Sequence, residues 1–388
     1  MRIVIAPDSY KESLTAAQVG QSIRDGFAEV FPDATFDVKP MSDGGEGFMA
    51  ILAREKGLAM REFPVHDPLG REIRASLAFD EVHSIAFLDF ASACGLELVE
   101  DGLRNPWICS SRGAGELIKS ALELGATHCV VGLGGSATID GGAGLLQALG
   151  ATCLDTDGKA ILDGPIGLAT LDVLDLSTMT TLLRGCSLTI ATDVDNPLVG
   201  PSGAARTFGP QKGAHSTMID DIEAALCRFA DKVATRTGVD SRLSPATGAA
   251  GGAAFVLHSC LGATLTNGAR LVAEQIRLAE AISQADLVIT GEGMLDDQSF
   301  RGKVPMIVAA IALGLGKPVI AINGGLKAEL AVLTASGVNA AFSSVNSISS
   351  REMAFLHASD NLRKVASNVA AVYALGRSHT ECLLKGDL

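Results

Sequence analysis

The sequence lacks the features that mark several large classes of protein. None of its eight cysteines belongs to a C-x-x-C pair, and most lie in apolar runs where a free thiol packs as a small hydrophobic residue. No apolar run reaches the roughly 18 residues that a membrane helix requires, and the N-terminus has no charged region followed by a long apolar one. We therefore expect neither a membrane span nor a secretory signal, and the scattered thiols indicate a reducing, cytoplasmic location.

Positive charge is also scarce. The 388 residues include 31 lysines and arginines against 44 aspartates and glutamates, which gives a formal net charge of −13. A surface of this sign repels nucleic acids and anionic membranes, so neither is an expected partner. Small molecules are the expected partners, and local cations must meet any that are anionic. The sequence leaves open whether the chain forms a homodimer.

Four apolar runs stop at loops of glycines, carboxylates and hydroxyls, and together they indicate where a ligand binds. The runs are RIVIAPDSYKES, HCVVGLGGSATIDGG, SLTIATDVDNP and ADLVITGEGMLDDQS. Such runs are typical of buried strands in an α/β sheet, whose ligands bind beyond the carboxyl ends of the strands. We therefore expect the chemistry in these loops. None of the seven histidines lies in them, so a histidine-based mechanism is not expected.

The hydrophobic pattern predicts an alternation of strands and helices, interrupted by an antiparallel region at 62–90 with a DPLG turn. Predicted strands cover 2–6, 36–40, 129–133, 188–191, 287–290 and 318–322. Predicted helices cover 16–31 (capped by Thr15), 115–124, 143–149, 218–236, 252–261, 271–283, 304–313 and 328–335, and another opens at 44–46. Near the C-terminus, an apolar stripe at helical spacing is typical of a core-facing helix: Phe355, Leu362, Val365, Val369 and Val372.

The change of pattern near residue 62 predicts a discontinuous domain. A doubly wound pattern occurs both before this point and at the carboxyl end of the chain. We therefore expect one α/β domain made of residues 1–62 and 262–388, and a second, mixed α/β domain of residues 63–261 inserted into it. The active site is expected in the cleft between the two.

The loops after the first and the last of the four runs carry carboxylates and lysines. Asp8, Ser9 and Lys11 follow the first run, and a lysine in such a loop is a good partner for a phosphate or a carboxylate. Glu292 and Asp296 follow the last run, close to glycines. Oxygen ligands without cysteine or histidine suit Mg²⁺ and phosphate rather than zinc or a redox metal.

The SDGGEGF motif has two interpretations. Asp43 and Glu46, three residues apart at a helix start, have the spacing of a capping box. The glycines between them also leave the helix terminus bare, which makes it an anion site. Both interpretations can hold at once.

The two middle loops combine glycines, hydroxyls and charge. GLGGSATIDGGAG fits neither the Walker spacing nor G-x-G-x-x-G, but its glycine pair, Ser136 and Asp140 make a cradle for phosphate or sugar oxygens. In the next loop Asp193 lies nearer the strand end, whereas Asp195 fits a solvated loop. Lys212, after two Gly/Pro turns, is one of few cations available to an anionic ligand.

Seven segments, in order and over nearly the whole chain, resemble the bacterial glycerate kinase family of the glycerate 2-kinase type. They are APDSYKESL, SDGGEG, GLGGSATIDGGAG, TDVDNPL, FGPQKGA, GAAGG and DLVITGEGMLDDQSFRGKVP. The resemblance implies transfer of the ATP γ-phosphoryl group to D-glycerate with Mg²⁺, giving 2-phosphoglycerate, and a two-domain architecture with one flavodoxin-like domain. The chain departs from the family's usual residues at Tyr10, Phe48 and Ile139, and Ile139 removes a polar group beside Asp140.

A kinase needs positioning, charge neutralisation and a modest base, and the candidate residues can be assigned on that basis. The expected catalytic residues are Asp193, as general base or metal ligand, with Lys11 and Asp8. The expected Mg²⁺ ligands are Asp193, Glu292 and Asp296. The expected substrate-binding residues are Ser9, Asp43, Glu46, Ser110, Ser111, Arg112 and Lys212. The expected ATP-binding or phosphate-binding residues are Gly134, Gly135, Ser136, Asp140, Gly141, Gly291, Glu292 and Gly293.

Three other functions stay open from the residues alone. Phosphorylation at the 3-hydroxyl of glycerate would use the same residue types. A dinucleotide-dependent oxidoreductase would carry a G-x-G-x-x-G turn after the first strand, where this chain has APDSYK. A non-catalytic protein that binds nucleotides or sugar acids would not need so many carboxylates facing one cleft.

Overall fold

A computed structural model describes residues 1–297, 299–345, 348 and 350–385, with side chains as far as residue 377. The chain divides into two compact units, which we call the terminal unit (residues 1–43 and 269–388) and the central unit (residues 44–268). Both are mixtures of helices and strands. Among the described residues, no helix is long and apolar enough to cross a membrane.

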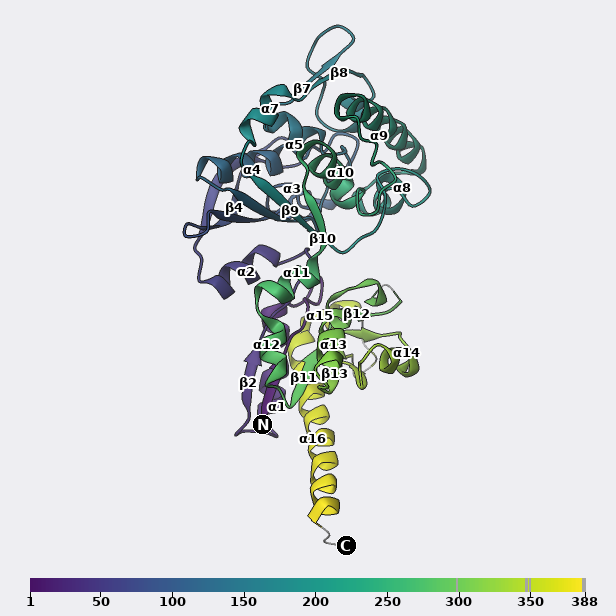
Figure 1. Cartoon of the computed structure of the whole chain (residues 1–388). Helices are drawn as coiled ribbons and strands as arrows, with labels where there is room; N and C mark the ends of the chain where they lie inside the picture. The colour runs from purple at the N-terminus through teal and green to yellow at the C-terminus, as the bar shows by residue number, and fades with distance from the viewer. Residues whose placement is uncertain (298, 346–347, 349, 386–388) are drawn as a thin grey trace. The chain divides into compact units, whose positions relative to one another are not determined.

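The terminal unit contains a five-stranded, fully parallel sheet in the order β15-β13-β11-β1-β2. In Figure 1 its strands include purple ones from the start of the chain and green ones from the last third. Its strands are β1 (Arg2–Ile5), β2 (Thr35–Val38), β11 (Leu287–Thr290), β13 (Val319–Asn323) and β15 (Ala340–Ser343), with a small parallel pair of β12 (Met294–Leu295) and β14 (Gly325–Leu326). Its helices are α1 (Ala16–Ala28), α11 (Gly268–Gln275), α12 (Leu278–Ser283), α13 (Val304–Gly314), α14 (Leu330–Ala335), α15 (Arg351–Leu356) and α16 (Ala358–Lys385), with a 3₁₀ turn at Ser299–Arg301.

The hydrophobic core of the terminal unit explains why β1 lies in the interior of the five-stranded sheet. Ile3 and Ile5 are fully buried and pair with residues of β11 and β2, and each buried side chain of this size contributes about 1.5–3 kcal/mol. On one side of this core α1 packs against α16. The helices approach so closely that a Cβ on Gly26 would lie 2.3 Å from the carbonyl oxygen of Arg363, so only glycine fits there.

The central unit contains a six-stranded mixed sheet in the order β10-β9-β6-β5-β4-β3. The pairings from β10 to β5 are parallel, and β5-β4-β3 is antiparallel. Its strands are β3 (Met60–His66), β4 (Glu72–Asp80), β5 (Ile85–Asp89), β6 (His128–Gly132), β9 (Ser187–Thr192) and β10 (Thr264–Asn267), with a separate hairpin of β7 (Thr152–Asp155) and β8 (Leu171–Asp175). Its helices are α2 (Phe48–Lys56), α3 (Ala91–Cys94), α4 (Arg112–Glu123), α5 (Ala143–Ala148), α6 (Pro165–Leu168), α7 (Ser177–Leu182), α8 (Ala204–Phe208), α9 (Ser216–Thr237) and α10 (Ala249–Leu261), with 3₁₀ turns at Leu96–Leu98, Asp101–Leu103 and Pro210–Lys212.

Several local predictions can be compared with these elements. The antiparallel region at 62–90 is confirmed, and so is Thr15, which caps α1 in a capping box with Gln18. The unit boundaries fall at 43/44 and 268/269, whereas the sequence analysis puts them at 62/63 and 261/262. The physical reason is that α2 packs on β4 and β5 of the central unit, although it precedes the change in sequence pattern.

The predicted start of the helix at 44–46 is wrong. The helix begins at Phe48, and its N-cap is Gly47 in the left-handed conformation (φ 77°) without a side-chain cap. Asp43 and Glu46 therefore do not form a capping box for α2. The sequence analysis also missed β10 and the β7–β8 hairpin, because these strands are short and lack a continuous apolar run.

Candidate active site

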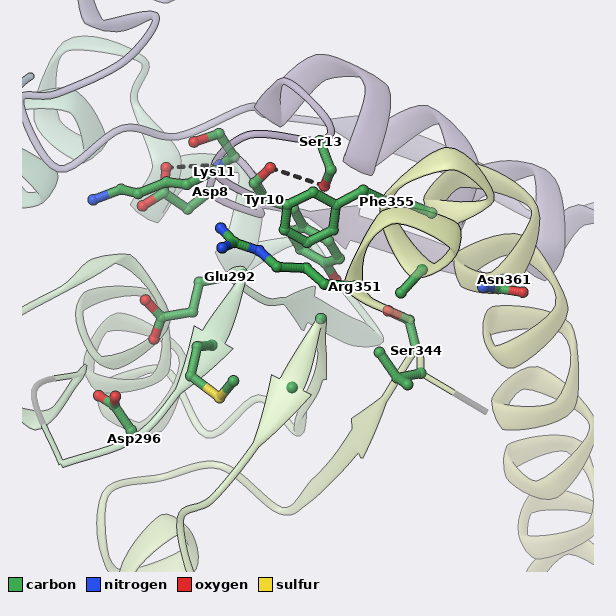
Figure 2. Close-up of a pocket in the computed structure, with 18 of the residues that line it drawn as sticks. Asp8, Tyr10, Lys11, Ser13, Glu292, Asp296, Ser344, Arg351, Phe355 and Asn361 are labelled. Carbon is green, nitrogen blue, oxygen red and sulfur yellow. Dashed lines mark hydrogen bonds between the residues drawn. The ribbon is translucent and has the colours of Figure 1, made fainter. Parts of the chain in front are cut away.

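The terminal unit contains a pocket of about 540 Å³ beyond the carboxyl ends of its parallel strands. It brings together seven residues that the sequence analysis selected: Asp8, Ser9, Lys11, Asp43, Glu292, Gly293 and Asp296. Figure 2 shows Asp8, Lys11, Glu292 and Asp296 on one side of this pocket. Residues that are almost 300 positions apart in the sequence thus meet because β1 and β11 are neighbours in the sheet.

Backbone hydrogen bonds hold the two loops of this pocket together. The amide of Asp8 donates to the carbonyl of Gly291 at 2.8 Å, and the hydroxyl of Tyr10 donates to the carbonyl of Ile322 at 2.7 Å. One carboxylate oxygen of Asp8 accepts from the amide of Ser9 at 2.7 Å. A Cβ on Gly291 would lie 1.7 Å from the Ile322 carbonyl oxygen, so this glycine allows β11 and β13 to approach closely.

Buried carboxylates of like charge dominate the electrostatics of the pocket. Asp8, Asp43 and Glu292 are each at most 6% exposed. Burial, reinforced by the charge of Asp43, raises the pKa of Asp8 well above its usual range, although the Ser9 amide and the Lys11 ammonium oppose this. Burial also raises the pKa of Glu292 to about 7. Its buried Oε1 atom has no hydrogen-bond partner. A cation, or a ligand that brings one, would relieve this arrangement.

The raised pKa of Glu292 predicts a pH-dependent stability. Because the folded state holds the Glu292 proton up to about pH 7 and the unfolded chain only to about 4.5, stability is lost as the pH rises through this interval. Glu292→Gln should therefore be on the order of 3 kcal/mol more stable than the unsubstituted protein at pH 7.5 and similar at pH 4.5, in urea unfolding without metal. Glu352→Gln, at an exposed position on α15, is the matched control. A Glu292→Gln curve parallel to that of the unsubstituted protein would contradict the prediction.

In the central unit, Asp140 joins the N-terminal ends of α4 and α5. It is fully buried, and its Oδ2 atom accepts from the amide and the hydroxyl of Ser111 at 2.8 and 2.7 Å. The amides of Gly142 and Gly144 donate to its two oxygens at 3.1 and 3.2 Å. Burial raises the pKa of Asp140, and these hydrogen bonds oppose the rise. The geometry favours a role in positioning the two loops, and direct contact of Asp140 with ATP stays a prediction.

Substitution of Asp140 separates these two roles. If it positions the loops, Asp140→Ala should lower the free energy of unfolding by about 3 kcal/mol, because several buried donors lose their acceptor. Urea unfolding measures this directly, with Asp195→Ala, at an exposed position, as the control. Unchanged stability combined with lost nucleotide binding would instead support the ligand role.

Lys212 is a buried cation held against the glycine-rich loop of the central unit. It is 3% exposed, and its Nζ atom donates to the Ser136 hydroxyl at 2.8 Å and to the Thr138 carbonyl at 2.9 Å. Burial lowers the pKa of Lys212 to about 7, although the charge of Asp140 opposes this shift. Ser136 and Lys212, which the sequence analysis selected separately, are thus in contact, and the hydroxyl of Thr138 beside them is buried without a hydrogen-bond partner.

The predicted serines and arginine at the start of α4 are bonded to two acidic residues, Asp163 and Asp140. Arg112 donates to Asp163 at 3.1 Å, and the Ser110 hydroxyl donates to the same oxygen at 3.3 Å. Ser111 faces Asp140 and not solvent. Binding of a substrate carboxylate by Arg112 would thus compete with Asp163, and this predicted role remains open.

The sequence of most of the chain matches a protein family. The model of the glycerate kinase family matches residues 3–374.

The chain belongs to the glycerate kinase family.

Similarity to relatives over nearly their full length supports that assignment. The glycerate 2-kinase of Escherichia coli (strain K12) is 46% identical over 97% of this chain and 99% of its own length. The glycerate kinase of Bacillus subtilis (strain 168) is 41% identical, with the same coverage of each chain. The crystal structure of a putative glycerate kinase 2 from Salmonella typhimurium LT2 has a TM-score of 0.83 at 43% identity, covering 97% of this chain and 99% of that one.

The remaining candidate site residues of this glycerate kinase lie in the central unit. Asp193 directly follows β9 and is half-buried, whereas Asp195 and Glu46 are exposed. The glycines divide by role. A Cβ on Gly134 would lie 2.2 Å from the Cα of Gly45, and Gly141 has a φ of +65° and faces Phe229, so both positions serve close packing. Gly135, also with positive φ, has only a loose neighbour at 3.4 Å.

The sequence analysis missed the residues of one wall of the terminal unit's pocket. Ser344, Arg351, Phe355 and Asn361 line it, from the segment before α15 to the start of α16. The apolar stripe of the C-terminal segment was predicted to face the core, and this holds for the buried Leu362 and Val369. It is wrong for two members: Phe355 lines the pocket, and Val372 is 62% exposed. No motif in this segment signals a ligand.

Proposed function

We propose that this protein transfers the γ-phosphoryl group of ATP to the 2-hydroxyl of D-glycerate, giving 2-phosphoglycerate. One observation carries the proposal: the buried Asp8, Asp43 and Glu292 line one pocket, together with Lys11 and Lys303, at the carboxyl ends of parallel strands. Phosphoryl transfer needs such positioned charges and no covalent intermediate on the protein. The name of the Escherichia coli relative, a glycerate 2-kinase, supports the choice of the 2-hydroxyl.

Mg²⁺ is the proposed cofactor, and the donor set of the pocket fits it. Glu292 and Asp296 offer carboxylate oxygens, and the unpartnered Oε1 of Glu292 is available to a cation. Among the residues that the structure describes, no group of three or more His, Cys, Asp or Glu side chains is arranged to hold a metal alone. Mg²⁺ in kinases is usually bound by one or two carboxylates together with substrate phosphates, whose charge it neutralises. We propose Glu292 and Asp296 in this role, with Asp193 as a further ligand or as the base.

We propose roles for the other candidate residues, which lie in the loops of the two units. Lys11 and Lys212 screen phosphate or substrate charge, with Asp8 beside Lys11 in the catalytic set. The candidates for substrate contacts are Ser9, Asp43, Glu46, Ser110, Ser111 and Arg112, and the candidates for ATP contacts are Gly134, Gly135, Ser136, Asp140, Gly141, Gly291, Glu292 and Gly293. We also propose that the terminal unit is a flavodoxin-like domain, because the strands of its five-stranded sheet, numbered in chain order within that sheet, follow the order 2-1-3-4-5. The free thiols of the seven cysteines whose side chains are described support the proposed cytoplasmic location.

The test of the proposal also tests the metal. Purified protein with ATP, Mg²⁺ and D-glycerate should give 2-phosphoglycerate, which ³¹P NMR distinguishes from the 3-phosphate. In excess EDTA turnover should be lost, because the pocket's lysines alone cannot neutralise a triphosphate beside several carboxylates. Full activity in EDTA would exclude the metal, and 3-phosphoglycerate as the product would exclude the proposed regiochemistry.

A further inference from the structure

The pocket of the terminal unit has two chemically different sides. Carboxylates and lysines line the side that the loops after β1 and β11 form. On the other side the lining is largely apolar and comes mainly from α15 and the start of α16: Val345, Ala354, Phe355 and Ala358, with Ser344 and Asn361 as polar groups. Figure 2 shows Phe355, Ser344 and Asn361 on this side, away from Asp296 and Glu292. A ligand that fills both sides must have one strongly polar part, which brings a cation to the carboxylates or meets the lysines, and one flat or apolar part.

Arg351 connects the two sides. Its guanidinium carbon lies 5.0 Å from the centre of the Phe355 ring, a cation–π contact that holds both side chains on the same face of α15. In Figure 2 the guanidinium points toward Asp8, Lys11 and Glu292. It pairs with Glu12 at 2.7 Å, and both side chains are about 70% exposed (71% and 68%). An ion pair so exposed contributes little stability, so Arg351 can exchange Glu12 for a phosphate at small cost.

We propose that the apolar side binds the purine base and ribose of the nucleotide against Phe355, and that Arg351 binds its phosphates. The identity of the nucleotide rests on the proposed function, because only the phosphoryl donor has both a triphosphate and an aromatic base. The cavity, at about 540 Å³, lies within the 300–1,000 Å³ typical of small-molecule sites. Aromatic rings bind bases by stacking, and arginine binds phosphates with paired hydrogen bonds. The proposed nucleotide-binding residues are therefore Phe355 and Arg351, which lie outside all four glycine-rich loops.

Calorimetric titration with ADP and with inorganic tripolyphosphate, both with Mg²⁺ and without glycerate, separates the two contacts. Phe355→Ala should weaken ADP binding about tenfold or more and leave tripolyphosphate binding unchanged, because only ADP has a base to stack. Arg351→Ala should weaken both about tenfold. If Phe355→Ala does not fold, Phe355→Leu replaces it, because leucine keeps an apolar side chain without a ring. Phe355→Leu should show the same loss of ADP binding and the same unchanged tripolyphosphate binding.

Two controls distinguish ligand contacts from structural support. Leu356→Ala changes an exposed apolar neighbour on α15 that does not line the pocket, and it should bind ADP normally. Glu12→Gln breaks the same ion pair as Arg351→Ala but leaves the guanidinium in place, so it should keep or improve tripolyphosphate binding. Equal losses in Glu12→Gln and Arg351→Ala would show that Arg351 only ties α15 to the β1 loop.

The outcomes also separate this inference from the proposed function. If the unsubstituted protein binds ADP, the Phe355 and Arg351 variants lose binding as described, and D-glycerate is not phosphorylated, the nucleotide site stands and the proposed substrate is wrong. If D-glycerate is phosphorylated but both variants bind ADP normally, the function stands and the site assignment is overturned. Absence of ADP binding by the unsubstituted protein overturns the site assignment whatever the activity.

Discussion

Asp193→Asn should lower kcat at least about 10²-fold, the range typical for loss of a positioned base. The substitution keeps the size of the side chain and removes both its basicity and its charge. Asp193 directly follows β9 and is half-buried, so it meets the positional requirement for a carboxylate at a strand's carboxyl end. The thermal midpoint should stay the same or rise, because active-site charges are commonly retained at the expense of stability. Steady-state kinetics with ATP and D-glycerate and thermal unfolding give both values.

The matched control lies two residues away. Asp195 is exposed in the same loop, and Asp195→Asn should change kcat only slightly. If the two variants exchange phenotypes, the loop is catalytic but the chosen residue is wrong. If neither variant affects turnover, the base or metal ligand lies in another loop.

Lys11→Ala should lower kcat/KM about 10²-fold or more, equivalent to roughly 2.7 kcal/mol of transition-state stabilisation. Lys11 lines the pocket beside Asp8: burial raises the pKa of Asp8 and the Lys11 ammonium partly opposes this, so the charge of Lys11 acts inside the pocket. A phosphate bound there would lose this charge in the variant. Lys39→Ala, which changes another lysine of the terminal unit outside the pocket lining, is the control. Near-normal kinetics in a folded Lys11→Ala protein would show that the lysine does not contact phosphate or substrate.

The sequence predicted the pocket's strand-end loops well, for a simple physical reason. Parallel strands are buried on both faces, so they appear as short apolar runs, and polar residues directly after them lie at one edge of the sheet. Asp8 and Glu292 could therefore be chosen without knowing that β1 and β11 are neighbours. Figure 1 shows how that pairing unites the two ends of the chain in one unit.

Side-chain direction and irregular segments could not be predicted in this way. The sequence around Asp140 has the composition expected of a ligand-binding loop, but the Asp140 carboxylate turns inward to Ser111 and two glycine amides. Local pattern does not distinguish a carboxylate that accepts internal amides from one that meets a ligand. Arg351 was missed and Phe355 was assigned to the core, because α15 is one short helix of six residues that reaches the pocket only through tertiary packing.

The central position of β1 also determines when the pocket can form during synthesis. β1 pairs with β2 on one side and with β11 on the other, and 281 residues separate the end of β1 from the start of β11 (286 − 5). A ribosome adds about 5–20 residues per second, so one edge of β1 waits on the order of 15–60 s for its partner. Throughout that interval an apolar strand has an unpaired edge, which favours association with other chains. The whole central unit is synthesised within the same interval, so the terminal unit and its pocket are complete only when almost the entire chain has been made.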